Sequence, residues 1–253
     1  MIPKLSRLLS FTSHRRIGRT GFVYEPESDP GPLHNAVAGD IARTQTVPPW
    51  IVVDHSKTSI TFTNWPGCLW LVEVDEPAPR WEQMNDIYTR ARSVRLLKRE
   101  SPNDIFGLYG DKVAAILDKA SQLSTDTVHQ FPAATPAAHR SYSNGWDTWI
   151  KDSDTETQSE MEHRNTLSLG FSGRDSPIGP GFVLLHNVIW KRAGQIDRES
   201  AILLDEDGEF HFSEQWQAAF DAAKHAAMAV ALPNAFTNSE LHELTSPWRQ
   251  VVD

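Results

Sequence analysis

The pattern of hydrophobic and polar positions is most regular between residues 46 and 77, where three short segments have the composition of β-strands. Residues 50–53 are apolar throughout, which predicts a strand that is buried on both faces. Residues 59–63 alternate between polar and apolar side chains, as a half-buried strand does, and residues 69–74 form a third, mostly apolar segment. Turn-forming residues separate the three segments. This pattern predicts an antiparallel β-meander in the first half of the chain.

The same periodicities predict elements on both sides of the meander. Residues 21–25 form a short strand before it, and residues 93–98 form a strand after it. A helix over residues 86–99 fits the second of these patterns almost as well. Between the first strand and the meander, apolar side chains recur at helical spacing after a proline, which predicts a helix over residues 32–43. The first half is thus predicted to hold three to five strands.

Helical periodicity dominates the second half of the chain. Apolar stripes and capping residues predict helices over residues 111–123, 136–150, 182–193, 214–232 and 238–244. Residues 201–204 and 209–212 have the character of two strands joined by a tight turn, which predicts a β-hairpin. We therefore predict an α+β fold in which an antiparallel meander of three to five strands packs against helices, with one β-hairpin in a mainly helical second half.

The chain is predicted to consist of a basic arm and one domain. Residues 1–20 show no strong periodic core pattern, and we expect them to form a basic N-terminal arm. Residues 21–253 are long enough to enclose one large core, so we predict a single α+β domain there. An internal boundary near residues 131–135 is the alternative, but a hairpin at residues 201–212 that rejoined the first sheet would make the chain one domain.

A tight turn is predicted over residues 64–67, which read Asn-Trp-Pro-Gly. Gly67 is expected to adopt a positive φ in this turn, a conformation that β-branched residues avoid. Gly67→Val is therefore predicted to destabilise the protein, whereas Trp65→Ala is predicted to have a milder effect.

The chain is acidic, with 24 Lys and Arg residues, 33 Asp and Glu residues and a net charge of −9. An acidic surface repels phosphate backbones, so the composition argues against nucleic acid as a partner. The start of the chain is the exception, because it carries five cations and no acid: Lys4, Arg7, Arg15, Arg16 and Arg19. We interpret these residues as part of a solvated arm.

Cysteine content and apolar segments bear on the cellular compartment. Cys68 is the only cysteine, which excludes an internal disulfide, and we expect its thiol to be buried. No apolar run approaches the roughly 20 residues that cross a bilayer, and the N-terminus lacks the small-residue cleavage site of a secretory signal. The sequence therefore predicts a soluble cytoplasmic protein with no membrane partner.

A glycine-rich stretch at residues 170–181 is the strongest candidate for a ligand-binding site. Glycines let backbone N–H groups approach a ligand, and the helix predicted to follow would present its positive N-terminal end to an anion. Arg174 would add a bidentate donor, and His186 lies one turn inside the helix. The candidate ligand-binding residues are Gly173, Arg174, Asp175, Ser176, Gly179, Gly181 and His186. The alternative is a mobile surface loop before a core helix, with His186 bonded inside the protein.

Sequence motifs for metal ions, cofactors and nucleophilic catalysis do not occur. The ten histidines are dispersed, and no P-loop, dinucleotide-binding glycine motif or nucleophile elbow is found. We therefore predict no metal site and no cofactor. Nine tryptophans are many for this length; we expect most to fill the core and some to line a pocket or an interface.

Part of the predicted sheet resembles a known family. Residues 67–77 (GCLWLVEVDEP), Tyr88-Thr89-Arg90 and Val94-Arg95-Leu96 are similar in spacing and strand character to the later strands of small ADP-ribosyltransferase-like domains of the antibiotic-modifying type. The resemblance covers about 30 residues and implies an enzyme that acts on a nucleotide or an NAD-like ligand. It assigns no catalytic residue, because the early histidine-containing strand of such a domain is not recognisable here.

Two classes of function follow from these observations. An acidic, tryptophan-rich chain without a catalytic motif favours a soluble cytoplasmic binding or protein-interaction protein that has no catalytic centre of its own. Its partner would be an unidentified protein or a small anionic ligand. The alternative is a transferase that acts on a nucleotide or NAD. A rise in melting temperature with a nucleotide would favour the transferase.

Overall fold

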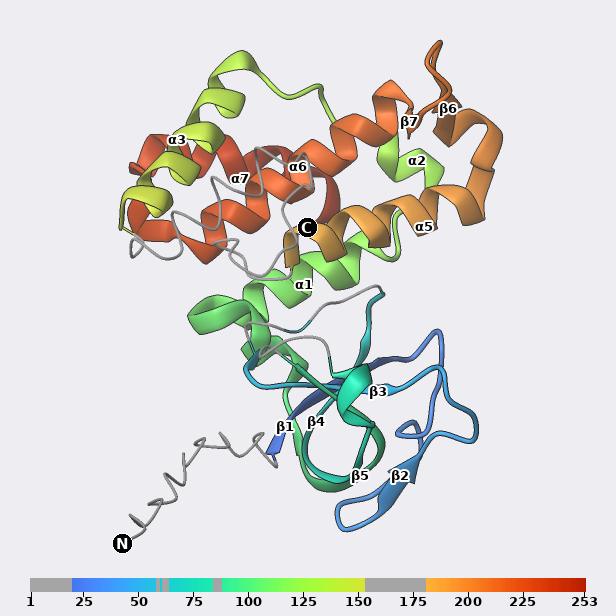
Figure 1. Ribbon diagram of the computed structural model, residues 1–253. Coiled ribbons are helices and arrows are strands. Elements are labelled where there is room, and N and C mark those ends of the chain that lie inside the picture. Colours follow the sequence, from blue (N-terminus) through green and yellow to red (C-terminus); the bar gives the residue numbers. More distant parts are fainter. Residues whose placement is uncertain (1–19, 58–59, 61–63, 84–87, 153–180) are drawn as a thin grey trace, which may run out of the picture.

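The computed structural model describes residues 20–57, 60, 64–83, 88–152 and 181–253 of the chain. Within these ranges a sheet lies at one end of the molecule and a group of helices at the other (Figure 1). The predicted α+β class is confirmed, including the mainly helical second half and its hairpin. The strand predicted for residues 59–63 lies outside the described residues, except for Ile60.

In the described part of the chain the large sheet is antiparallel and contains β1 (Thr20–Pro26), β2 (Ile41–Arg43), β3 (Ile51–Asp54), β4 (Gly67–Pro77) and β5 (Tyr88–Glu100). β1 pairs with β3 and β4, and β5 pairs with β2, β3 and β4. Since β1 and β5 each join β3 to β4, the sheet closes on itself as a small barrel (Figure 1). Register shifts near Val72 and Glu76 let the long strands β4 and β5 bend around this barrel.

The barrel differs from the predicted meander in three places. β3 and β4 follow one another among the described strands but do not pair. Val52 is 41% exposed, so the apolar strand has only one buried face. Residues 32–43 form turns and β2 instead of the predicted helix. Contacts between distant segments explain why this helix does not form. The Leu33 N–H donates a hydrogen bond to the Glu25 carboxylate at 3.0 Å, and the backbone of β2 pairs with that of β5.

The helical part contains α1 (Gly110–Ala120), α2 (Thr125–Val128), α3 (Pro136–Asp152), α5 (Gly181–Ala201), α6 (Glu214–Ala231) and α7 (Asn238–Val252). The short helices η2 (Arg80–Glu82), η3 (Pro102–Tyr109) and η4 (Pro233–Ala235) lie between longer elements. The predicted capping box is confirmed, because Thr237 and Glu240 each accept a hydrogen bond from the backbone N–H of the other. The hairpin strands β6 (Ile202–Leu204) and β7 (Phe210–Phe212) form a separate sheet and do not rejoin the barrel.

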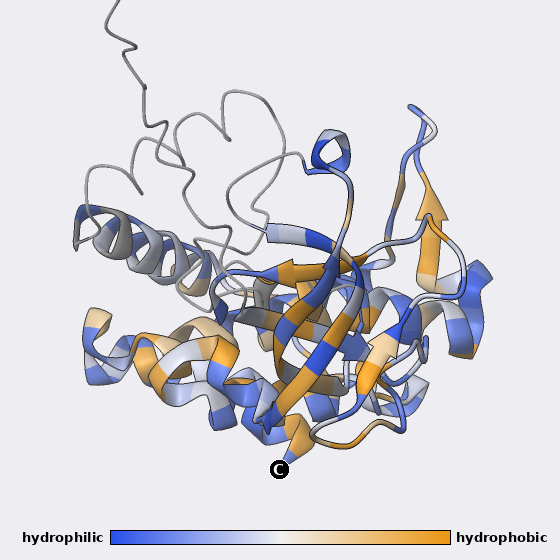
Figure 2. Cartoon of the chain, turned by 60° about the horizontal axis from the view of Figure 1, so that its bottom comes forward, coloured by the Kyte–Doolittle hydropathy of each residue, from blue (hydrophilic) through white to orange (hydrophobic). Residues whose placement is uncertain are grey.

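Two large buried clusters stabilise these parts, and a third, small one contains Ala138, Ala229 and Leu244. One fills the barrel with side chains such as Val53, Val72 and Leu96. The other is centred on α6, whose alanines let α1 and α5 pack closely against it. Leu69 of β4 and Tyr24 of β1 project outward from the barrel and join this helical cluster. Figure 2 shows hydrophobic and hydrophilic residues along the barrel strands.

Three further expectations concern burial and domain organisation. Cys68 is buried, as predicted, and burial raises the pKa of its thiol. No helix in the described part of the chain combines the length and the apolar character that a bilayer span requires. The single domain over residues 21–253 stays a prediction, as does the basic arm at residues 1–20.

Gly67→Val should lower the free energy of unfolding by about 2–3 kcal/mol, but not for the reason that the sequence suggests. Positive φ values occur at three other described glycines, and Gly67 is not one of them. Instead, a Cβ at this position would lie 2.4 Å from the Tyr24 ring and 2.5 Å from the Glu25 carbonyl oxygen. A backbone oxygen cannot move aside without disrupting the β1–β4 pairing. Urea titration measures the loss.

The matched control is Gly194→Ala in α5, where the nearest atom to an added Cβ is the Ile202 Cδ1 at 3.8 Å. This substitution should leave stability unchanged or raise it, since alanine favours a helix by up to about 1 kcal/mol over glycine. Equal urea midpoints for Gly67→Val and the unsubstituted protein would contradict the predicted clash.

Candidate functional site

The site predicted from the sequence lies mostly outside the described residues. Five of the predicted site residues lie between residues 153 and 180, which are outside the described ranges: Gly173, Arg174, Asp175, Ser176 and Gly179. The anion site at the glycine-rich segment therefore stays a prediction. Gly181 is the first residue of α5, which therefore begins one residue before the predicted helix and continues beyond its predicted end to Ala201.

His186 is the one predicted site residue whose side chain can be placed. Its half-buried ring stacks on Trp190 with 5.6 Å between ring centroids, and it contacts Phe212 and Phe220 at 5.3 Å each. Burial among these rings lowers the pKa of the imidazole, with a smaller opposing contribution from a hydrogen bond to Asn187. These contacts place His186 in an aromatic cluster, and its role in ligand binding stays a prediction.

A buried polar cluster lies next to these aromatic rings, between α3 and α6. His225 is 2% exposed, and its ring lies 5.0 Å from Tyr142 and 5.3 Å from His139. Asp221 forms an ion pair with Lys224, whose ammonium also lies over the Tyr142 ring at 5.4 Å. Burial, aided by the charge of Lys224, lowers the pKa of His225 to about 4.

The centre of this cluster is enclosed, whereas His139 at its edge is exposed. The His225 Nε2 is buried and has no hydrogen-bond partner among the described residues. Burial is also the main reason that the pKa of Tyr142 is raised. The four described cavities are lined by other residues. We therefore treat it as a determinant of stability.

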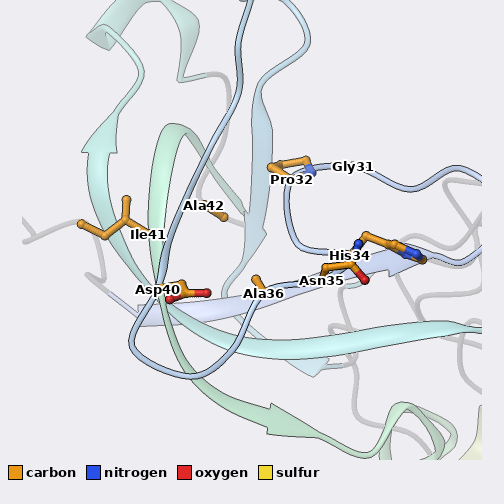
Figure 3. Close-up of a pocket in the computed structure, with 8 residues that line it drawn as sticks. All are labelled: Gly31, Pro32, His34, Asn35, Ala36, Asp40, Ile41 and Ala42. Atoms are coloured by element: carbon orange, nitrogen blue, oxygen red, sulfur yellow. The ribbon is translucent and has the colours of Figure 1, made fainter.

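The loop between β1 and β2 borders a shallow pocket of about 420 Å³. His34 and Asn35 lie at one end of it, whereas Asp40 and Ile41 lie at the other (Figure 3). The Asp40 carboxylate accepts a hydrogen bond from the Val37 N–H at 3.0 Å, so it holds the loop in shape. The polar side chains do not converge on one point, and the pocket has no set of groups that could act together.

A groove of about 370 Å³ between α1, α6 and α7 is the best candidate for a ligand site. Its volume lies in the range of about 300–1,000 Å³ that is usual for small-molecule sites. Residues three or four positions apart on each helix face the groove, because such residues share one face of a helix. The apolar floor consists of Ile116, Ala226, Val230 and Trp248. Trp248 is held in place by stacking on Phe131 at 5.5 Å.

Charged side chains surround this floor. Lys112 and Lys119 of α1 and Arg249 of α7 supply three cations, and Asp253 supplies one carboxylate. Lys119 donates to the Asp253 carboxylate and to the Val252 carbonyl oxygen, and it lowers the pKa of Asp253. Lys112 lies over the Tyr109 ring at 5.1 Å and forms no ion pair with the described residues. We name the floor and these four charged residues the cationic groove.

Sequence reasoning missed the cationic groove. The helical periodicity of residues 111–123 places Lys112 and Lys119 on a stripe that is expected to face solvent. Nothing in the sequence shows that α7 crosses next to this stripe or that its Arg249 lies on the same side. The only available signal was the spacing of seven residues between the two lysines, which puts them on one face of α1.

Neither the placement of metal-binding side chains nor a comparison with known proteins assigns a function to this chain. Among the described residues, no group of three His, Cys, Asp or Glu side chains is placed to hold a metal ion. No protein-family model matches the chain. Searches of curated proteins and of solved structures also find no significant match.

Proposed function

We propose that this protein binds a small anionic ligand with an apolar body, and that the cationic groove is its site. The observation that carries the proposal is the group of three cations around an apolar floor in a chain whose net charge is −9. Cations are scarce in this chain relative to acids, so three at one small cavity are a local reversal of its charge.

The chemistry of the groove favours an anion that is also partly apolar. Lys112 has no carboxylate partner among the described residues, so an incoming anion does not need to displace one. Arg249 lies 3.8 Å from Asp253 and is 71% exposed, so most of its donors face solvent. The floor would bury the apolar part of a ligand, at about 25 cal/mol for each Å² removed from water.

Binding is favoured over catalysis by the state of the titratable groups. The Asp253 side-chain carboxylate is paired with Lys119, and its lowered pKa makes it a poor proton acceptor. The other three charged groups of the cationic groove are two lysines and an arginine. A nucleotide or NAD is itself an anion with an apolar ring. Nucleotides and NAD are therefore included among the ligands tested below, so that the transferase alternative is tested as well.

We expect decanoate to bind the full-length protein more tightly than decanol does, as measured by isothermal titration calorimetry. Lys112→Gln should weaken decanoate binding about tenfold, because one charge-assisted contact contributes about 1.5 kcal/mol. Decanol binding should be unchanged by this substitution. The matched control is Lys151→Gln, which removes an exposed lysine near the end of α3 and should leave both affinities unchanged.

Equal affinities for decanoate and decanol, or equal losses in the two lysine variants, would contradict the proposed site. A thermal-shift panel with ATP, ADP and NAD separates the two functional classes, because a ligand at 100 times its dissociation constant stabilises the fold by about 2.7 kcal/mol. Stabilisation by a nucleotide that is retained in Lys112→Gln would favour the transferase and a different site.

A further inference from the structure

The arginines of the barrel gather on its outer surface, away from the helical part. Along β5 the buried Thr89 and Ala91 alternate with Arg90 and Arg92, and Arg95 follows the buried pair Ser93 and Val94. These three arginines therefore project outward. Figure 2 brings this end of the molecule forward, and hydrophilic residues recur along its strands.

The neighbouring strands add to the same surface. Arg90 lies opposite Val52 of β3 in the sheet register, and Arg95 lies opposite Ile41 of β2. Val52 and Ile41 are 41% and 47% exposed, so this face of the sheet is open. Arg43, two residues after Ile41 on β2, projects to the same side. The strand pairing thus brings four arginines from two strands onto one face.

Carboxylates neutralise only part of this charge. Arg43 and Arg92 share Glu76 at 3.0 and 3.7 Å, and Arg90 contacts Glu82 at 3.4 Å. Arg95 forms no ion pair with the described residues. Glu73 lies opposite it in the β4–β5 register, but no ion pair joins the two side chains. Asp75 of β4, which accepts a hydrogen bond from the Ser93 hydroxyl at 2.7 Å, is a further carboxylate beside these strands. Two carboxylates thus bind three of the arginines, and Arg95 is the arginine that an incoming anion can reach without displacing a bound carboxylate.

Aromatic side chains border the arginines. Trp81 in η2 is 82% exposed. Trp50 lines a pocket of about 400 Å³ together with Val52 and Arg90. The guanidinium of Arg90 also lies 5.9 Å from the centre of the Tyr88 ring. We name the four arginines together with Trp50, Trp81 and Tyr88 the arginine face.

We propose that the arginine face binds single-stranded nucleic acid. The guanidinium groups match phosphate geometry, and exposed aromatic rings give unpaired bases surfaces on which to stack. A duplex keeps its bases stacked inside and would leave Trp81 and the Trp50 pocket without a partner. An acidic peptide would satisfy the arginines but not the flat rings. This site lies on the barrel and is independent of the cationic groove.

The net charge of the chain argues against nucleic acid only if the charge is spread evenly. At an ionic strength of 0.15 M the screening length is about 8 Å, so acids on distant surfaces have little effect at this face. The arginines that a phosphate can reach at this face therefore decide whether it is attracted. Composition cannot reveal this arrangement of arginines, because it depends on which strands pair.

The test is fluorescence anisotropy with a fluorescein-labelled 15-nucleotide oligo(dT) and the full-length protein in 50 mM NaCl. Three or four phosphate contacts predict that log K falls against log[NaCl] with a slope of about −2 to −3. Arg92→Glu combined with Arg95→Glu should weaken binding at least tenfold and make the slope shallower by about 1.4, since two phosphate contacts are lost. Trp81→Ala should weaken binding about fivefold or more and leave the slope unchanged.

The matched control is Arg140→Glu, which reverses an exposed arginine of α3 in the helical part and should change affinity less than twofold. A second control replaces Arg15, Arg16 and Arg19 with alanine, because the basic arm could itself attract phosphates. The melting temperature of each variant shows whether it is folded. We expect all variants to fold, because Trp81 is exposed and Arg95 forms no ion pair with the described residues.

Four outcomes would overturn the proposal. The first is no anisotropy change with oligo(dT) or oligo(rU) in 50 mM NaCl. The second is equal or tighter binding of a 15-base-pair duplex, and the third is equal or tighter binding of a 15-residue poly-glutamate. The fourth is affinity that is lost in the arm variant but kept in the Arg92/Arg95 and Trp81 variants.

Discussion

Trp65→Ala should lower the free energy of unfolding by about 3–5 kcal/mol, the usual cost of truncating a buried tryptophan. The Trp65 side chain is 9% exposed and lies where the barrel meets the helical part. Its ring contacts Phe106 with 5.6 Å between centroids, and its Nε1 donates to the Asp118 carboxylate at 2.7 Å. The substitution would remove both contacts and leave a cavity in the helical cluster. Urea titration of the full-length protein measures the effect.

Two further variants divide this effect into its parts. Trp65→Phe keeps most of the ring but loses the indole N–H, so it should cost less than Trp65→Ala and report the hydrogen bond to Asp118. Trp81→Ala is the matched control, because a side chain that is 82% exposed should change stability by less than about 0.5 kcal/mol. A loss below about 1 kcal/mol for Trp65→Ala would contradict its role in the core.

The expected order of the two turn substitutions is the reverse of the sequence-based prediction. That prediction made Trp65→Ala milder than Gly67→Val, since a tryptophan between an asparagine and a proline was interpreted as a turn residue. The burial of Trp65 and its bond to Asp118, 53 residues further along the chain, make it a core residue. The larger loss is therefore expected for Trp65→Ala.

The second large effect is a loss of stability between pH 6.5 and pH 4 that depends on His225. The pKa of this imidazole is about 4 in the folded protein, against 6.5 for an ordinary histidine. Below pH 6.5 the unfolded chain binds a proton that the folded chain does not, so acid favours unfolding. The loss accumulates as the pH falls and is complete near pH 4. Its size is about 3 kcal/mol, because each pKa unit corresponds to about 1.4 kcal/mol.

His225→Phe should remove this dependence while keeping an aromatic ring against Tyr142 and His139. The measurement is the free energy of unfolding at several pH values for both proteins. The comparison isolates His225, because His186, whose pKa is also lowered, contributes equally to both curves. Carboxylates with lowered pKa values, such as Glu100, lose their contribution only below about pH 4.5. Parallel curves for the two proteins would contradict the prediction.

Local patterns in the sequence were sufficient to predict most of the elements. The apolar stripe of α1, the alanine-rich stripe of α6, the capping box at Thr237 and the β6–β7 hairpin all form where they were predicted. Each depends on residues within a few positions of one another, because helix caps, helical faces and tight turns are set by short-range geometry. The α+β class follows from the order of these elements.

Tertiary structure decided which residues meet. β5 supplies backbone partners to β2, so residues 32–43 do not form the helix that their spacing predicts. The same strand closes the barrel by pairing with β3 and β4, an arrangement that depends on hydrogen bonds between distant segments. The glycine at position 67 is required by its approach to Tyr24 and Glu25 rather than by its own φ.

Both proposed sites depend on contacts between segments that are distant in the sequence. The cationic groove exists because α7 brings Arg249 to the side of α1 that carries Lys112 and Lys119. The arginine face exists because β2 and β5 pair in a register that puts their arginines on one side. The sequence alone determined the local elements and the overall charge, since both depend on neighbouring residues or on simple sums. Where the charges gather depends on long-range pairing, and only the tertiary structure decided that.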